Sequence, residues 1–292
     1  MNKLSLIMIS TFQNFDLVNK LVESLSSSNK NIDLQVVIVN QTDQDYFVES
    51  TDFTKYHIIN YNKKCGLSKA RNIAINYINN KGLFADHYMF PDDDSSYDSI
   101  FFEQYNNFIK RDENYLINVL NTGTSVPYKA NRYKSGQVIK SNDYGFAMSV
   151  NQIISYDTFT KVNIFDENLG VGAEFGAAED ADYYLRCATV KRYIYISEIY
   201  NYHPANLAKF SSLDYTIVLN RFKSYSKGFV FFALKHKLTR DYYVFLVRAI
   251  VVMFYYLIRL ELKLVKVYWN MFFYRIKIYF EIKGRIQTLN KI

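Results

Sequence analysis

The first 90 residues alternate short apolar runs with segments whose apolar residues recur every three or four positions. Four runs have the length of buried strands, at residues 4–10, 34–40, 56–61 and 87–90. Helical spacing occurs between them, after Asn14, which suits an N-cap, and again over residues 67–80. Strands and helices in this order predict an α/β fold with a mostly parallel sheet flanked by helices.

The middle of the chain has a less regular pattern. Apolar runs occur at residues 115–120 and 145–150, a strand-like run lies at 193–200, and a polar loop spans 121–143. Residues 177–188 predict a helix whose first turn carries Glu179, Asp180 and Asp182. Acidic residues at a helix start are favoured by the helix dipole, so a purely structural role is one interpretation of this cluster.

The C-terminal part is expected to form long helices, because it has no proline and only two glycines after residue 220. Residues 242–258 are apolar except for Arg248, and a membrane span needs about 20 residues. On one helical wheel a basic stripe forms, made of Arg248, Arg259, Lys263, Lys266 and Lys277. Three interpretations follow: a helix in the interface of an anionic membrane, a helix that packs in the core or in a homodimer, and a single span.

Composition and charge favour two parts with different partners. Apolar residues make up 49% of the chain and charged residues 22%, which excludes a disordered protein. Residues 221–292 hold 15 Lys and Arg against 3 Asp and Glu, whereas the rest holds 20 against 25. We expect a domain of residues 1–215 and a basic, aromatic helical extension of residues 216–292.

Two distant cysteines and no signal-peptide cleavage pattern favour the cytoplasm.

Three consecutive acids, Asp92 to Asp94, follow the apolar run that ends at Phe90. Carboxylates at a strand end can hold Mg²⁺ or Mn²⁺. The coordination positions of the cation that the protein leaves open suit diphosphate oxygens. The loops after Ser10 and Asn40 should converge on the same crevice, because ligands bind at the carboxyl ends of parallel strands. The simpler interpretation is a solvated turn in which an aspartate caps a helix at residues 96–110.

Other polar residues favour a ligand site over a solvated turn. Lys69 and Arg71 lie in the first turns of the helix at 67–80, where anions are favoured, although Arg71 could also lie along the surface. Glu179 and Asp180 follow a glycine-rich loop. His203, just after the strand-like run, is either a structural histidine or a ligand that completes a metal site.

These motifs, in this order, resemble the inverting nucleotide-sugar glycosyltransferases of family 2, which have the GT-A fold. The resemblance covers about residues 1–210 and is carried by MISTFQN (8–14), VVIVNQTDQD (36–45), GLSKARN (66–72), FPDDDSSY (90–97), FDENLGVGAEFGAAEDADYYLR (165–186) and YHP (202–204). Residues 221–237 are similar to the Tyr/Gly/basic segment that often follows the catalytic domain of non-processive members.

The resemblance implies roles for individual residues. Thr11 and Phe12 would line the nucleotide, Arg71 would contact the diphosphate, and Asp94 and His203 would hold Mn²⁺ or Mg²⁺, with Asp92 and Asp93 at the donor ribose or sugar. The register of the D-x-D motif stays open, so Asp92 could share the metal. Asp180 would be the general base, with Glu179 and Asp182 positioning the acceptor and its loop. Attack opposite the leaving diphosphate gives inversion.

The chain departs from the family pattern at two places. The acidic pair that commonly reads the base is replaced by Asn40-Gln41, so Asn40 or Asp43 would have to substitute in a UDP-sugar site. The Q-x-x-R-W motif of processive synthases is missing, since the only tryptophan is Trp269. Transfer of one sugar per acceptor is therefore expected.

The leading hypothesis is a peripheral enzyme at the cytoplasmic face of the cell membrane, acting on a lipid-linked glycan in the synthesis of a surface polysaccharide such as a capsule. The basic tail would bind the anionic membrane, and no nucleic-acid partner is expected. The rival hypothesis is a catalytically inactive membrane-binding or scaffold protein with the same fold. A sugar nucleotidyltransferase is disfavoured, because no G-x-G-T-R start follows the first strand.

Overall fold

The computed structural model describes residues 4–130, 132–204 and 212–289 and divides the chain into two compact units. The sheet unit comprises Met1–Glu167 and Glu179–Ala205, and the helical unit comprises Asn168–Ala178 and Asn206–Ile292. The predicted domain division after residue 215 stays a prediction. A feature absent from that prediction is that a short segment far from the C-terminus groups with the C-terminal helices.

The sheet unit is built on one seven-stranded sheet in the order β3-β2-β1-β4-β6-β5-β7. Its strands are β1 (Ser5–Phe12), β2 (Asp33–Asn40), β3 (Thr54–Asn60), β4 (His87–Met89), β5 (Asn114–Asn121), β6 (Gln152–Ser155) and β7 (Tyr193–His203). Only β6 runs antiparallel to its neighbours. The mostly parallel sheet predicted from the apolar runs is therefore confirmed.

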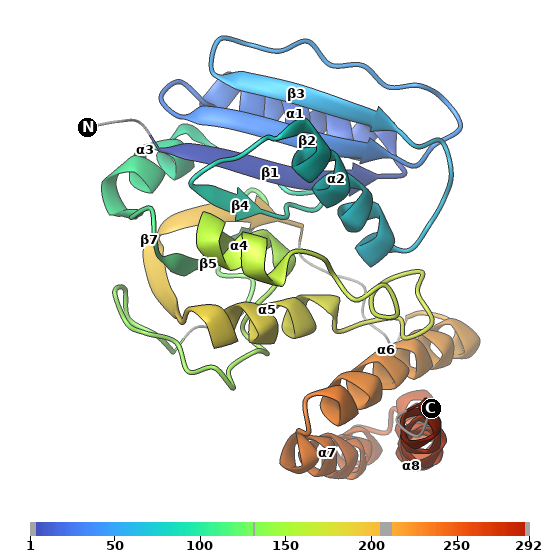
Figure 1. Ribbon diagram of the computed structural model, residues 1–292. Coiled ribbons are helices and arrows are strands. Elements are labelled where there is room, and N and C mark those ends of the chain that lie inside the picture. The colour runs from blue at the N-terminus through green and yellow to red at the C-terminus, as the bar shows by residue number, and fades with distance from the viewer. Residues whose placement is uncertain (1–3, 131, 205–211, 290–292) are drawn as a thin grey trace. The chain divides into compact units, whose positions relative to one another are not determined.

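Helices cover both faces of this sheet (Figure 1). On β1, Leu6 and Met8 point to the face covered by α1 (Phe15–Ser28) and α3 (Ser99–Phe108), whereas Ile7 and Ile9 point to the other face. That second face is covered by α2 (Leu67–Lys81), α4 (Tyr156–Val162) and α5 (Glu179–Val190). Because both faces are buried, the strands read as continuous apolar runs.

Two elements of the sheet unit were not predicted. Strand β6 and helix α4 are four and seven residues long, too short to show a period in the sequence. The apolar run at 145–150 begins in a turn and ends in a 3₁₀ helix, Ser149–Asn151. The predicted α/β fold, a mostly parallel sheet flanked by helices and followed by a helical extension, is confirmed.

The helix caps exclude one interpretation of the acidic triplet, in which one of its aspartates caps the following helix. Asn14 caps α1, accepting a hydrogen bond from the Asp16 amide at 2.8 Å. Helix α3 is capped by Asp98, which accepts from the Phe101 amide at 3.1 Å. Asp98 lies outside the triplet, so capping of α3 does not account for the three consecutive acids.

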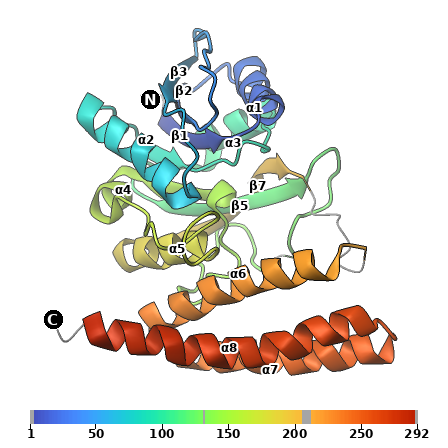
Figure 2. The ribbon, with the colours of Figure 1, turned by 90° about the vertical axis from the view of Figure 1, so that its right-hand side faces the viewer.

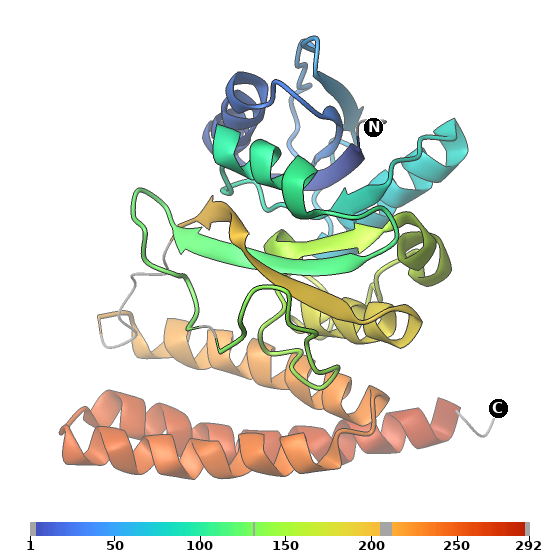
Figure 3. The ribbon, with the colours of Figure 1, turned by 90° about the vertical axis from the view of Figure 1, so that its left-hand side faces the viewer.

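The helical unit contains α6 (Tyr215–Lys235), α7 (Thr239–Ile258) and α8 (Leu262–Leu289), shown from two sides in Figures 2 and 3. Tyr242 stacks on Tyr279 and Tyr256 on Tyr268, so α7 and α8 run antiparallel. The prediction of one basic stripe on a continuous wheel is wrong, because the chain turns back between these helices with Leu260 at φ 56°.

Within the described residues, α7 is the one helix long and apolar enough to cross a membrane, with a mean hydropathy of 1.6. A single helix of this kind is weak evidence for a span. One side of α7 is more than half exposed, and its apolar members are Tyr243, Val244, Val247, Val251, Phe254, Tyr255 and Ile258. We call this side the α7 apolar face.

Candidate active site

The loops after β1, β2 and β4 meet at one edge of the sheet, because these three strands are adjacent and parallel. Gln41, directly after β2, links the end of β1 to the segment before α2. Its Nε2 donates to Thr11 Oγ1 at 2.7 Å, and its Oε1 accepts from the Cys65 amide at 2.8 Å. The convergence expected from the strand order is therefore present, at the edge where open α/β sheets bind ligands.

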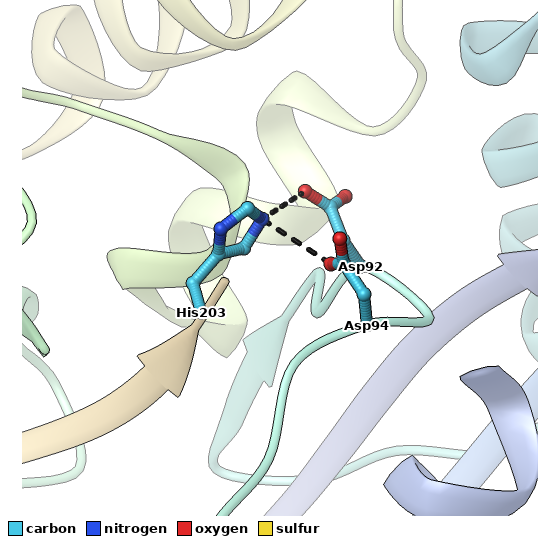
Figure 4. A group of neighbouring side chains, drawn as sticks. All are labelled: Asp92, Asp94 and His203. Carbon is cyan, nitrogen blue, oxygen red and sulfur yellow. Dashed lines mark ion pairs between the residues drawn. The ribbon is translucent and has the colours of Figure 1, made fainter. Parts of the chain in front are cut away.

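Asp92, Asp94 and His203 form a cluster at this edge (Figure 4). His203, the last residue of β7, lies with Nε2 at 3.2 Å from Asp94 Oδ1 and at 3.5 Å from Asp92 Oδ2. One ligand atom from each of the three side chains lies within 4.8 Å of the others. Asp93 is not a member of this group, so the geometry favours the D-x-D register Asp92-x-Asp94.

This donor set fits a divalent cation. Asp94 Oδ1 is buried and accepts no hydrogen bond from the described residues, although His203 lies at ion-pair distance. His203 Nδ1 lies 3.1 Å from the Pro204 carbonyl, and a proton held there leaves Nε2 as the ligand atom of the neutral ring. Two carboxylates and one imidazole suit Mn²⁺ or Mg²⁺, so the side chains present could hold the metal that the sequence predicts.

Crowding of the three acids shifts their proton affinities in different directions. Burial and then the charges of Asp94 and Asp92 raise the pKa of Asp93 to about 7. Burial also raises the pKa of Asp94. For Asp92, burial is outweighed by His203 and Arg71, which lower the pKa of its carboxyl. Burial opposes the positive form of His203, but Asp92 and Asp94 together raise its pKa. Negative charge is thus concentrated where a cation would sit.

Arg71 joins this cluster to the start of α5. Its side chain is 2% exposed, and its two terminal nitrogens donate to Asp92 Oδ1 at 3.0 Å and to Asp180 Oδ1 at 3.1 Å. Burial alone would lower the pKa of Arg71, but the charges of Asp180 and Asp92 raise it. A guanidinium can bridge two carboxylates in this way because its donors form a rigid planar fork.

The acidic residues Glu179 and Asp180 begin α5. Asp180 faces Arg71, and Glu179 lies half-buried beside it. Burial, and then the charge of Asp180, raises the pKa of Glu179 to about 7, and Arg71 opposes that rise. The arrangement keeps Asp180 beside a fixed positive charge and leaves Glu179 able to hold a proton near neutral pH.

Several predicted donor and acceptor contacts are buried in the structure. Phe12 is 1% exposed, with its ring 4.9 Å from that of Tyr46, and Asn40 is fully buried and donates to Asn60 Oδ1 at 2.9 Å. Asp182 is also fully buried, and its Oδ2 accepts from Arg186 at 2.9 Å. These side chains shape the loops from inside, so a ligand could touch them only after their neighbours moved. Their assigned roles stay predictions.

The remaining predicted donor contacts differ in exposure. Thr11 is half-buried and donates to the Val39 carbonyl at 3.1 Å, whereas Asp43 is exposed. Arg71 was expected at the diphosphate, but its guanidinium lies inside the protein between two carboxylates. Its contact with a donor stays a prediction, and the structure supports a role in organising the acids.

Sequence reasoning missed residues that hold the site together. Asn72 is buried and exchanges hydrogen bonds with the backbone of Phe165, and it also donates to Glu167. Gln41 makes the two hydrogen bonds described above. Both are neutral amides close to charged motif residues, so the charge pattern of the sequence does not distinguish them. A signal was present in the GLSKARN run, whose asparagine falls on the buried side of α2.

A protein-family model matches more than half of the chain. The model described as "Glycosyl transferase family 2" matches residues 6–162. This range covers β1 to α4 and contains the acidic triplet and Arg71, and it ends before Asp180. A search of curated protein sequences found no significant match.

Several solved structures are similar to this chain. One is S. aureus TarS 1-349, with 15% identity and a TM-score of 0.49 over 77% of this chain and 70% of that one. A mannosyltransferase, PcManGT from Pyrobaculum calidifontis, was solved with GDP-Man and Mn²⁺ and shows 10% identity and a TM-score of 0.49, over 77% and 62%. GalNAc-T7 with UDP, GalNAc and Mn²⁺ shows 12% identity and a TM-score of 0.47, over 77% and 47%. The chain thus spans less than two thirds of the length of the last two.

Proposed function

The chain belongs to glycosyl transferase family 2, and from this premise we propose that it transfers one sugar from a nucleotide diphosphate sugar to an acceptor hydroxyl, with inversion. The observation that carries the proposal is the pairing of Arg71 with both Asp92 and Asp180. It joins a carboxylate–imidazole cluster suited to a diphosphate-bound cation with a carboxylate suited to deprotonate the acceptor. A sugar transferase needs these two functions next to each other.

Asp180 is the proposed general base. It accepts the proton of the acceptor hydroxyl while that oxygen bonds to the anomeric carbon and the bond from this carbon to the diphosphate oxygen breaks. Attack from the side opposite the leaving group inverts the configuration. Arg71 orients Asp180, since the guanidinium is itself held by Asp92 and by the surrounding protein.

The donor end would be held by Asp92, Asp94 and His203 through a divalent cation. A bound Mn²⁺ or Mg²⁺ supplies positive charge that stabilises the leaving diphosphate. Asp93 lies outside the cluster with its pKa raised to about 7, which suits a hydrogen bond to a ribose or sugar hydroxyl. A UDP-linked sugar is the donor we propose to test first.

The acceptor is proposed to be a lipid-linked glycan at the cytoplasmic face of the membrane, in surface polysaccharide synthesis. Support comes from the α7 apolar face, where Arg240 and Arg248 flank a cleft of about 560 Å³ lined by tyrosine and valines. An apolar helix side bearing cations suits the interface of an anionic membrane. Such a surface would hold the enzyme where lipid-linked acceptors lie.

Two measurements test the activity. A panel of nucleotide sugars is screened with Mn²⁺ for a rise in melting temperature, since a ligand that binds the folded state stabilises it. The stabilising sugar is then used to measure nucleotide diphosphate release, which Asp180→Asn should abolish while leaving the fold and donor binding intact. Asp157→Asn, a change at an exposed pair with Lys161, is the control. Stabilisation without any release by the wild-type protein would favour an inactive, ligand-binding scaffold.

A further inference from the structure

The segment Asn168–Ala178 lies between two parts of the sheet unit in sequence but packs with the C-terminal helices. Leu169 is fully buried and Phe175 is 4% exposed, in a cluster whose other buried members are Val230, Ala233, Tyr242, Ile278 and Ile282. The ring of Phe175 stacks on that of Phe231, with centroids 4.1 Å apart and planes within 10°. The segment is therefore part of the core of the helical unit.

Helix α6 lies very close to the backbone of Ala177. A Cβ added at Gly228 would lie 2.6 Å from the Ala177 oxygen, 2.7 Å from its nitrogen and 2.9 Å from its carbonyl carbon. All three are backbone atoms, so no side-chain rotation can relieve the overlap. Glycine at this position is what permits α6 to lie against the segment. Gly228 belongs to the Tyr/Gly/basic segment 221–237, which the proposed chemistry leaves unexplained.

Two further contacts hold the same segment. A Cβ at Gly176 would lie 1.9 Å from the Ser224 hydroxyl, a group that can rotate away. Glu174 accepts from Arg285 at 2.5 Å and 3.3 Å and lies 3.8 Å from the Lys227 ammonium. Aromatic stacking, backbone contact and ion pairs thus fix residues 174–177 to the helices at successive positions.

The segment ends directly before α5, the helix that carries the proposed base. Ala178 has φ 73°, a conformation unusual for alanine, and the next residues are Glu179 and Asp180. We propose that the helical unit is a positioning part of the transferase as well as an anchor: through Gly228 and Phe231 it holds residues 168–178 and so sets how the chain delivers Glu179 and Asp180 to the acceptor. This inference rests on the proposed function, in which Asp180 is the base.

The test compares Gly228→Ala with Gly284→Ala in the full-length protein. Gly284 is the matched control, because it lies in a helix of the same unit and an added Cβ would meet nothing within 4 Å. We expect Gly228→Ala to lower kcat per donor-binding site by about 10- to 100-fold, since misplacing a reacting group by about 1 Å can cost two orders of magnitude. Donor affinity should stay unchanged, because the donor acids lie elsewhere in the chain. Gly176→Ala should have a smaller effect, and Gly284→Ala none.

Hydrogen exchange over residues 168–178 separates this inference from the proposed function. Gly228→Ala should lose protection in that segment while the strands of the sheet keep theirs. If the wild-type protein transfers no sugar, the proposed function fails, and the exchange result still shows whether the helices hold the segment. Wild-type kcat, or unchanged exchange, in a folded Gly228→Ala protein would overturn the inference.

A second variant covers the case in which Gly228→Ala does not fold. Phe231→Leu removes the ring that stacks on Phe175 without adding atoms. It should again lower kcat and raise exchange over residues 168–178 while leaving donor affinity intact. A purely structural role would reduce the number of donor-binding molecules and leave kcat per binding site unchanged, which would also overturn the inference.

Discussion

Replacement of Arg71 by methionine tests whether the buried guanidinium holds the two halves of the site together. Methionine keeps an unbranched apolar side chain beside Phe165, whose ring centre lies 5.2 Å from the guanidinium carbon. It removes the charge and both hydrogen bonds, to Asp92 and to Asp180. Two carboxylates are then left close together without their shared cation.

The expected loss of stability follows from burial. Removing one partner of a fully buried ion pair costs about 3–5 kcal/mol, because the remaining charge is uncompensated. Here the side chains of Asp92 and Asp180 keep 34% and 27% of their exposure, so water solvates them partly. We therefore expect Arg71→Met to lower the free energy of unfolding of the sheet unit by about 2 kcal/mol. The free energy of unfolding of Arg71→Lys should lie between those of the wild-type protein and Arg71→Met, since one ammonium cannot bridge both acids.

The assay must report on the sheet unit. The only tryptophan, Trp269, lies in α8, so its fluorescence follows the helical unit. Urea unfolding is instead followed by hydrogen exchange in β1, which belongs to the sheet unit. Lys161→Met is the control, because it breaks an exposed pair with Asp157 that should contribute about 0.5 kcal/mol or less. A loss no larger than that of Lys161→Met would refute the proposed role of Arg71.

Three other predictions address the metal, the pH dependence and the membrane. Asp94→Asn should weaken Mn²⁺ binding at least about tenfold, measured by calorimetry with the metal alone, since it removes a charged ligand; equal affinity would contradict the metal assignment. Burial lowers the pKa of His87 to about 4 in the folded protein. Between the usual pKa of histidine and pH 4 the unfolded chain therefore binds more protons than the folded protein. The free energy of unfolding should fall by about 3 kcal/mol as the pH is lowered through this range. That loss should be absent from the urea curves of His87→Gln. Val247→Asp with Val251→Asp should reduce sedimentation with vesicles containing anionic lipid, and undiminished binding would exclude the α7 apolar face as the contact.

Much of the fold was predictable because its strands and helices are local patterns. The buried runs that became β1, β2 and β4 have strand length, and the apolar residues of α1 and α2 recur at helical spacing. The basic stripe failed because one helical wheel was carried across a turn. A positive φ at Leu260 reverses the chain there, and leucine gives no sign of such a conformation in the sequence.

The sequence by itself determined which chemistry is available at the site: three acids at a strand end, two further acids at a helix start, an arginine before them and a histidine after them. Only the tertiary structure decided how these residues combine. Asp92 and Asp94, not Asp93, face His203, because backbone geometry after β4 sets the direction of each side chain. Arg71 pairs with Asp180, which lies 109 positions further along the chain, and Gly228 lies against Ala177. Contacts between segments so distant in the chain depend on packing, which no local pattern contains.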